Sequence, residues 1–189
     1  MSMKISLLKN QNYKSMPWKN GRGFTSEIAI FPLESTLEKN NFTWRLSSAE
    51  VTENGLFSSF PGCERYLTVI DGSGLKLQFE NENKLIDQNS FLKFSGEDKV
   101  SSELVNGKIK DLNLIIKKDI HRIEFNILSK SMNKLSQGTS IVFVMEGSVT
   151  VNDALTEKFD TVIIESEQNE NDISILPGSN SKYVLITIS

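Results

Sequence analysis

Short alternating segments recur along the whole chain, and they constrain the fold more than any other feature. Each segment is rich in β-branched or aromatic residues and is bounded by Gly, Asn, Asp or Ser, the pattern of a partly buried strand. The segments lie at 24–31, 42–51, 65–70, 74–79, 90–94, 111–118, 122–128, 140–145, 148–152, 160–166 and 182–188. No stretch keeps an apolar period of 3.6 over three turns. The sequence therefore predicts an all-β protein whose strands form a sandwich or barrel.

Two parts of the chain share one layout. "YLTVIDGSGLKLQF" and "IVFVMEGSVTVND" both place an acidic residue and a glycine between apolar runs, with Gly72 and Gly147 in matching places. Further strand segments follow each of them in the same order and at similar spacing. We therefore expect two copies of one β-unit, covering residues 1–120 and 121–189 and joined within the charged stretch 117–125.

Charge and composition exclude several classes of function. The formal net charge is −3 and the sequence pI is about 5.3, so the chain has no excess of positive charge with which to bind nucleic acid. Its apolar runs are far shorter than the ~20 residues that cross a bilayer, and residues 1–15 are too polar for a signal-peptide core. Cys63 is the only cysteine. We expect a cytoplasmic protein with no membrane and no nucleic-acid partner.

Several sequence blocks together resemble one protein family. "MPWKNGRGFTSEI", "FTWRLSSAEV", "GLFSSFPGCERYLTVIDGSGLKL" and "DLNLI" follow one another within residues 16–117, and in this combination the chain resembles the HutD/Ves family of bicupins. The resemblance implies two cupin units, which are jelly-roll β-barrels, with the second unit degenerate. It also implies a link to the control of histidine utilisation and binding of a small carboxylate such as N-formylglutamate. Ves members are described only as stress-induced.

The hairpin that carries metal ligands in many cupins lacks them here. Such cupins hold iron, manganese, zinc or nickel with histidines and a carboxylate, but "GCERYLTVIDG" contains no histidine. His121 is the only histidine of the chain and lies in the charged junction. We interpret it as a solvent-facing side chain, and we expect neither a metal nor another cofactor.

Arg65 stands in the segment where the histidines would be, and Arg45 lies on another predicted strand. Successive strand residues alternate between the two faces of a sheet, so Arg45 and Arg65 each share a face with apolar neighbours. The same rule places Asn113 on one face with Asp111. A guanidinium among apolar side chains is costly unless an anion meets it. We therefore expect a pocket inside the first unit, with Arg45 and Arg65 binding a carboxylate and Asn113 serving as the amide partner.

An alternative in which these arginines bind no ligand remains open. Both could lie on solvent-facing strand faces, or they could pair with carboxylates that are near in the sequence. The candidates for such pairs are Glu50, Glu53 and Glu64.

The stretch "WKNGRG" precedes the first long strand segment. It lacks the Gly-Lys-Ser/Thr sequence of a phosphate-binding loop, whereas Asn-Gly readily forms a tight turn. We expect a turn that leads into residues 24–31, and we place Trp18, Lys19 and Asn20 at the rim of the pocket. A turn without any role in binding is the alternative.

Together these features predict a bicupin without metal that binds a small anionic metabolite in a sensing or regulatory role. We assign no catalytic residue and expect a binding protein rather than an enzyme. The alternatives are a metal-independent isomerase or hydrolase acting on a similar acid, and a stress-related protein without a small-molecule ligand. A homodimer that pairs exposed sheet edges is a further open alternative.

Overall fold

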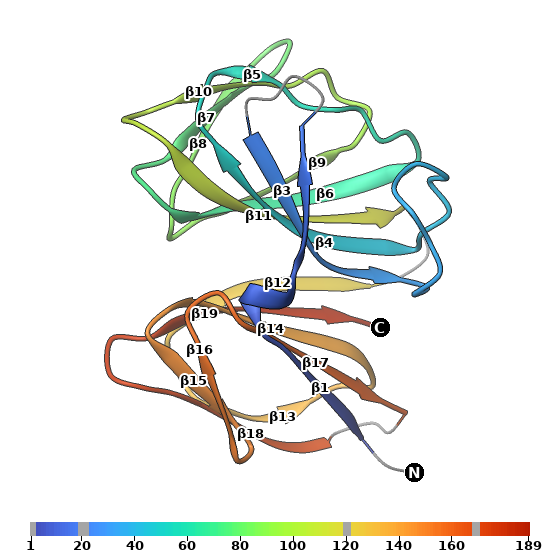
Figure 1. Ribbon diagram of the computed structural model, residues 1–189, viewed down its shortest axis with the longest axis vertical. Coiled ribbons are helices and arrows are strands. Elements are labelled where there is room, and N and C mark those ends of the chain that lie inside the picture. The colour runs from blue at the N-terminus through green and yellow to red at the C-terminus, as the bar shows by residue number, and fades with distance from the viewer. Residues whose placement is uncertain (1–2, 19–22, 119–121, 168–170) are drawn as a thin grey trace. The chain divides into compact units, whose positions relative to one another are not determined.

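The fold was analysed in a computed structural model that describes residues 3–18, 23–118, 122–167 and 171–189. Strands make up nearly all of the regular structure in these ranges, and the one helix in them is a single 3₁₀ turn, η1 (Asn10–Asn12). No helix among these residues is long and apolar enough to cross a membrane. The chain divides into two compact units (Figure 1). We call Lys14–Ile120 the upstream unit, and His121–Ser189 with Met1–Tyr13 the downstream unit.

The upstream unit consists of two antiparallel sheets. The six-stranded sheet has the order β2 (Lys14–Pro17), β3 (Gly23–Phe31), β4 (Trp44–Val51), β11 (Ile109–Lys117), β6 (Cys63–Asp71), β9 (Phe91–Ser95). The four-stranded sheet has the order β5 (Gly55–Leu56), β10 (Ser101–Leu104), β7 (Leu75–Gln78), β8 (Asn83–Ile86). One apolar cluster contains residues of both sheets, among them Leu67, Val69, Leu75 and Leu77. The core of this unit therefore lies between the two sheets.

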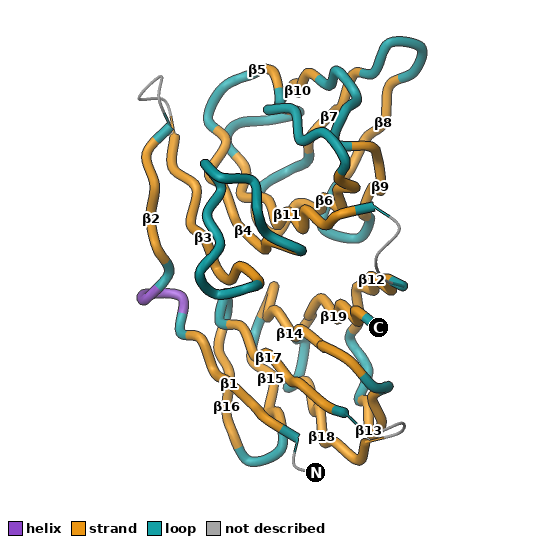
Figure 2. Tube along the Cα trace, turned by 90° about the vertical axis from the view of Figure 1, so that its right-hand side faces the viewer, coloured by secondary structure: helices purple, strands orange, loops and turns teal. Residues whose placement is uncertain are grey.

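The downstream unit has the same arrangement. Its five-stranded sheet has the order β1 (Lys4–Leu8), β17 (Thr161–Ser166), β14 (Gly138–Glu146), β19 (Lys182–Ile188), β12 (Ile123–Leu128). Its four-stranded sheet has the order β13 (Met132–Leu135), β18 (Asn171–Pro177), β15 (Ser148–Val151), β16 (Ala154–Glu157). Figure 2 shows how strands dominate both units.

Strand order repeats between the units. The run β4-β11-β6-β9 corresponds to β12-β19-β14-β17, and β5-β10-β7-β8 corresponds to β13-β18-β15-β16. In the hairpins that follow β6 and β14, Gly72 and Gly147 have φ angles of 97° and 68°. Residues other than glycine rarely adopt such angles, which explains why glycine stands at both positions.

The structure corrects the predicted boundary at the amino-terminal end. Residues 1–13 were expected in the first unit, but β1 pairs with β17, so this segment belongs to the downstream unit. Asp160 holds the segment in place: its carboxylate accepts hydrogen bonds from Lys9 Nζ at 2.8 Å and from the Asn10 backbone N–H at 2.9 Å. Such long-range pairing leaves no local signal in the sequence.

Candidate functional site

The candidate site lies on three adjacent central strands of the upstream unit. Arg45 on β4 and Arg65 on β6 both stand opposite Ile115 of the intervening strand β11. Residues directly opposite each other share a face of the sheet, so the two guanidinium groups project from the same face. Leu67 and Val69 alternate with Arg65 along β6 and belong to the core cluster. The arginines therefore point toward the interior of the unit.

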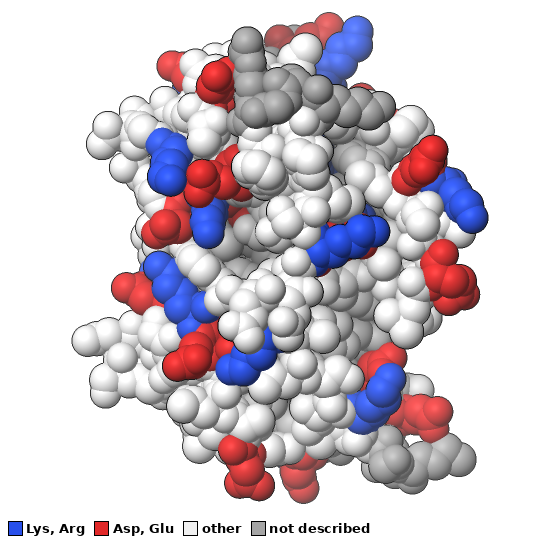
Figure 3. Space-filling view, viewed as in Figure 1, with Lys and Arg blue, Asp and Glu red and all other residues white. Residues whose placement is uncertain are grey.

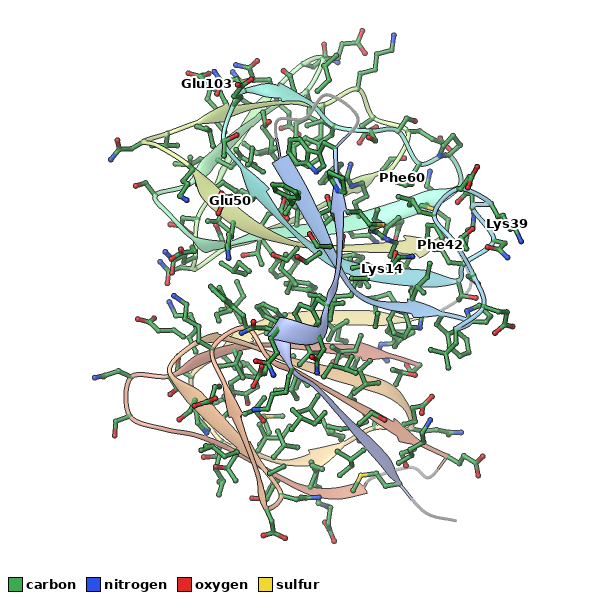
Figure 4. The ribbon with its side chains drawn as sticks, viewed as in Figure 1. Lys14, Lys39, Phe42, Glu50, Phe60 and Glu103 are labelled. Carbon is green, nitrogen blue, oxygen red and sulfur yellow. The ribbon has the colours of Figure 1, made fainter. Side chains whose placement is uncertain are left out.

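Arg65 is almost completely enclosed, with 3% of its surface exposed. Its Nη1 donates a hydrogen bond to the backbone oxygen of Ser58 at 3.2 Å, and its Nε lies 3.5 Å from Asn113 Oδ1. Three aromatic rings surround the guanidinium carbon, with centroids 4.7, 5.1 and 5.6 Å away; they belong to Phe57, Phe94 and Phe60. In Figure 4, Phe60 lies toward one end of β6 and Glu50 toward the opposite side of the unit. Both hydrogen bonds are long, and the aromatic rings add cation–π contacts that offset part of the cost of burying the charge.

Arg45 is equally buried but has a carboxylate partner. Its Nε donates to Glu27 Oε2 at 2.7 Å, and its Nη1 donates to Ser47 Oγ at 3.0 Å. The third nitrogen, Nη2, is buried and has no hydrogen-bond partner among the residues that the structure describes. A buried donor without a partner costs about 1–3 kcal/mol, and more when the group is charged. A ligand oxygen would satisfy it.

Burial shifts the pKa values of Arg65 and Asp111 within the cluster. Burial lowers the pKa of Arg65 to about 10, and the nearby positive charge of Arg45 adds to this shift, while Asp111 opposes it. Asp111 lies on the same face of β11 as Asn113 and is 2% exposed. Its Oδ1 accepts the backbone N–H of Ala49 at 2.9 Å. Burial raises the pKa of Asp111 to about 7, against the opposing effects of that hydrogen bond and of Arg65.

One of the three predicted rim residues is described, and it packs beside this core. Trp18 is half-buried against the apolar cluster, and its Nε1 donates to Thr25 Oγ1 at 2.8 Å. Gly23 allows this packing, because a Cβ there would lie 2.9 Å from the indole ring. Lys19 and Asn20 lie outside the described residues, so their predicted place at the rim stays a prediction.

The structure brings together Arg45, Arg65 and Asn113, and it adds residues that the sequence interpretation missed. Arg45 pairs with Glu27, whereas two of the carboxylates that we considered have lysine partners instead: Glu50 contacts Lys108, and Glu64 contacts Lys93. Strict alternation in "TSEIAIF" places Glu27 on the face opposite Ile28 and Ile30 and so suggests an outward glutamate. A bulge between Glu27 and Ala29 interrupts that alternation, however, and the sequence does not reveal it.

The donor types in the cluster suit an anion better than a metal ion. Both of its carboxylates, Glu27 and Asp111, lie near guanidinium groups, which repel a cation. Across the ranges that the structure covers, no three His, Cys, Asp or Glu side chains form a group that could hold a metal. His121 lies outside those ranges.

The residues of the downstream unit that correspond to this site carry no positive charge. Counting back from the acidic residues before Gly72 and Gly147 aligns Arg65 with Ser140, and cross-strand register then aligns Arg45 with Glu124. In the same way Asn113 corresponds to Leu185 and Asp111 to Tyr183, which both belong to an apolar core cluster. An open depression of about 230 Å³ beside these residues is lined by exposed residues such as Asn126 and Lys134. We therefore regard the upstream cluster as the candidate site, because its polar groups are buried and the interactions are less screened by solvent.

The fold and the site define a cupin-type β protein without the histidine ligands of a metal cupin. A cupin 2 conserved barrel domain protein from Leptotrichia buccalis superposes over 97% of this chain and 96% of its own, with a TM-score of 0.54 at 15% identity, a likeness of fold alone. The model of the HutD family matches residues 10–180. The chain belongs to the HutD family.

Individual relatives agree with this assignment. An uncharacterized 21.2 kDa protein in the hutC 3′ region of Pseudomonas putida is 36% identical over 146 residues, covering 76% of this chain and 75% of the relative. Protein Ves of Citrobacter koseri is 30% identical over 140 residues, with 73% and 71% covered. The solved structure of HutD from Pseudomonas fluorescens SBW25 has a TM-score of 0.87, 30% identity and 98% coverage of both chains.

Proposed function

We propose that this protein binds a small carboxylic acid between Arg45 and Arg65 and acts as a sensor or regulator rather than as an enzyme. The observation that carries the proposal is the buried Nη2 of Arg45, which has no partner in the described part of the chain and lies in a cluster with a second buried guanidinium. Glu27 already pairs with Arg45, so the proposal depends on the arginine donor that this pair leaves without a partner. A carboxylate offers two oxygens in a geometry that guanidinium groups bind well.

The ligand class follows from the remaining polar groups. Asn113 supplies an amide beside Arg65, and Ser47 supplies a hydroxyl beside Arg45. These groups suit an acid that also carries an amide, a formyl group or a second carboxylate. Membership of the HutD family and the relative from the hutC region support a histidine-degradation intermediate such as N-formylglutamate. We further propose that the two units are two cupins, with the ligand site in the upstream one.

A thermal-shift and calorimetry series tests the proposal. The panel comprises N-formyl-L-glutamate, L-glutamate, glutarate and formate, with sodium chloride at equal ionic strength as the control. We expect at least one acid to raise the unfolding temperature and to bind with a stoichiometry of one per chain. Failure of every acid to bind would contradict the proposal.

The variant Arg65→Met separates binding from folding. Loss of the guanidinium should weaken acid binding tenfold to a hundredfold, the effect of about 1.5–3 kcal/mol for a charge-assisted hydrogen bond. Without ligand the variant should be about as stable as the wild type, because Asp111, the counter-charge of Arg65, can take up a proton once the guanidinium is absent. Arg122→Met is the matched control, since Arg122 is exposed in the downstream unit. An equal loss of binding in both variants would exclude a specific role for Arg65.

One observation favours the enzymatic alternative enough to test it in the same samples. Asp111 combines burial, a pKa of about 7 and a place beside a cationic group, which are also the properties of acid–base groups in active sites. Proton NMR of each bound acid, followed over a day with and without protein, would reveal turnover. Unchanged spectra favour the binding protein.

A further inference from the structure

The carboxyl group of Asp111 is buried within the cluster, and burial raises its pKa to about 7. It lies on β11 between β4 and β6, opposite Ala49 and Val69. Oδ1 accepts the Ala49 N–H, and a proton on Oδ2 leaves that hydrogen bond intact. The group can therefore exist in either charge state without a change of backbone position.

The charged groups that share its interior face are few. Arg65 projects from β6, Arg45 from β4 and Glu27 from β3. The interior positions on the opposite sheet are uncharged, with Leu75 and Leu77 on β7 and Ser102 on β10. Lys76 and Glu103, on the other face of that sheet, pair with each other. Because Glu27 is hydrogen-bonded to Arg45, the counter-charge left for Arg65 is Asp111.

A bound carboxylate would compete for this role. An anion placed between the two arginines neutralises Arg65 and at the same time brings a negative charge close to Asp111. Two carboxylates that share a small buried site rarely both stay ionised. Protonation of Asp111 removes the repulsion and turns the group into a hydrogen-bond donor toward the ligand.

We propose that Asp111 takes up one proton from solvent when a carboxylate binds between Arg45 and Arg65, and that this exchange of counter-ion makes Asp111 a specificity-determining residue of the site. The inference rests on the proposed function. A protonated Asp111 donates to a ligand oxygen and offers no negative charge to an ammonium group. The site should therefore prefer acids whose second polar group is a carbonyl or carboxyl oxygen over acids that carry a free amine.

The proton can be counted directly on the wild-type protein. Titration calorimetry with N-formyl-L-glutamate and with glutarate is run at pH 8 in two buffers of different ionisation enthalpy. The dependence of the binding enthalpy on the buffer should correspond to uptake approaching one proton per ligand. Since both acids are fully ionised above pH 6, the apparent Kd should rise from pH 7 upward, by as much as about tenfold per pH unit.

The variant Asp111→Asn provides the matched test, because asparagine is isosteric, stays neutral and keeps an oxygen for the Ala49 N–H. We expect its Kd to be the same at pH 6.5 and pH 8.5 and its proton uptake to fall to about zero. Asp153→Asn is the control, since Asp153 is an exposed aspartate in the turn after β15, and it should keep the wild-type profile.

The possible outcomes separate the two proposals. Acids that bind to the wild type without proton uptake and with a flat pH profile would overturn the role of Asp111 but leave the anion site in place. A wild-type slope in Asp111→Asn would do the same. If no acid binds at any pH, the proposed function fails and the exchange of counter-ion fails with it. The wild-type measurement decides the matter even if Asp111→Asn does not fold.

Discussion

At the scale of single residues, the charges in the upstream core are arranged at a cost to the unliganded fold. Arg45 and Arg65 are each 3% exposed and Asp111 is 2% exposed, although burial disfavours every charged side chain. Residues of this kind persist when they serve a purpose other than stability. Charges on the surface cost the fold little, because solvent screens them. Figure 3 shows acidic and basic side chains interspersed over the visible face.

The raised pKa of Asp111 predicts how stability depends on pH. The ordinary pKa is 3.8 and burial raises it to about 7, so folding is accompanied by proton uptake between these values. The contribution of Asp111 to the free energy of unfolding is present in full below pH 4 and is lost as the pH rises to 7. Asp111→Asn lacks this loss. The unfolding free energy of the variant relative to the wild type should rise by about 2–4 kcal/mol between pH 5 and pH 8.

Urea denaturation at several pH values, without ligand, measures this difference. Comparing two proteins cancels the contributions of other carboxyl groups, such as Asp87, whose pKa is lowered by hydrogen bonds from the Asn89 backbone N–H and the Ser90 hydroxyl. A constant difference between variant and wild type across this range would show that Asp111 is ionised in both states.

At the scale of elements, the sequence predicts the central strands well and the peripheral strands poorly. Three predicted segments, 65–70, 111–118 and 140–145, correspond to β6, β11 and β14. A long central strand buries a regular set of side chains, so its period is visible in the sequence. The strands that were not predicted are β1, β2, β5, β8, β10, β13, β16 and β18. Six of them have two to four residues, too few for a period to be visible, whereas β1 has five and β18 has seven.

The same distinction applies to the candidate site. Alternation along each strand placed Arg45, Arg65 and Asn113 on their faces correctly, because a strand has a fixed period. It could not identify which strands are neighbours. Glu27 therefore escaped notice, since its pairing with Arg45 joins β3 and β4, which the sequence does not show to be neighbours.

Attachment of the amino-terminal segment yields a prediction for the downstream unit. Asp160 is 3% exposed and also accepts the Glu157 backbone N–H at 3.1 Å, in addition to its bonds from Lys9 and Asn10. Replacement of Asp160 by alanine leaves these donors without their partner and should lower the unfolding free energy by about 2–4 kcal/mol. Urea denaturation measures the loss, with Asp153→Ala as control. Equal stability of the two variants would refute the role of Asp160 in holding β1.

At the scale of the whole molecule, the two units share a strand order but differ in what occupies their interiors. The interior positions of Arg65, Asn113 and Asp111 correspond to Ser140, Leu185 and Tyr183 in the downstream unit. Both units therefore keep an apolar core, while the buried arginines among the described residues, Arg45 and Arg65, lie in the upstream unit.

Hydrogen-exchange mass spectrometry should detect this asymmetry. A saturating acid is expected to slow amide exchange in β4, β6 and β11, because it links the three strands through Arg45, Arg65 and Asn113. Exchange in the corresponding strands β12, β14 and β19 should not change. Equal slowing in both sets would contradict a site confined to the upstream unit.

Acid binding at Nη2 of Arg45, as proposed above, has a consequence for the amount of protein in a cell. A ligand that binds only the folded chain stabilises it by an amount that grows with ligand concentration. Proteases remove chains in proportion to the time they spend unfolded. Chains that hold the acid therefore survive longer than empty chains, so the cellular level of this protein would follow the supply of the acid even at a constant rate of synthesis.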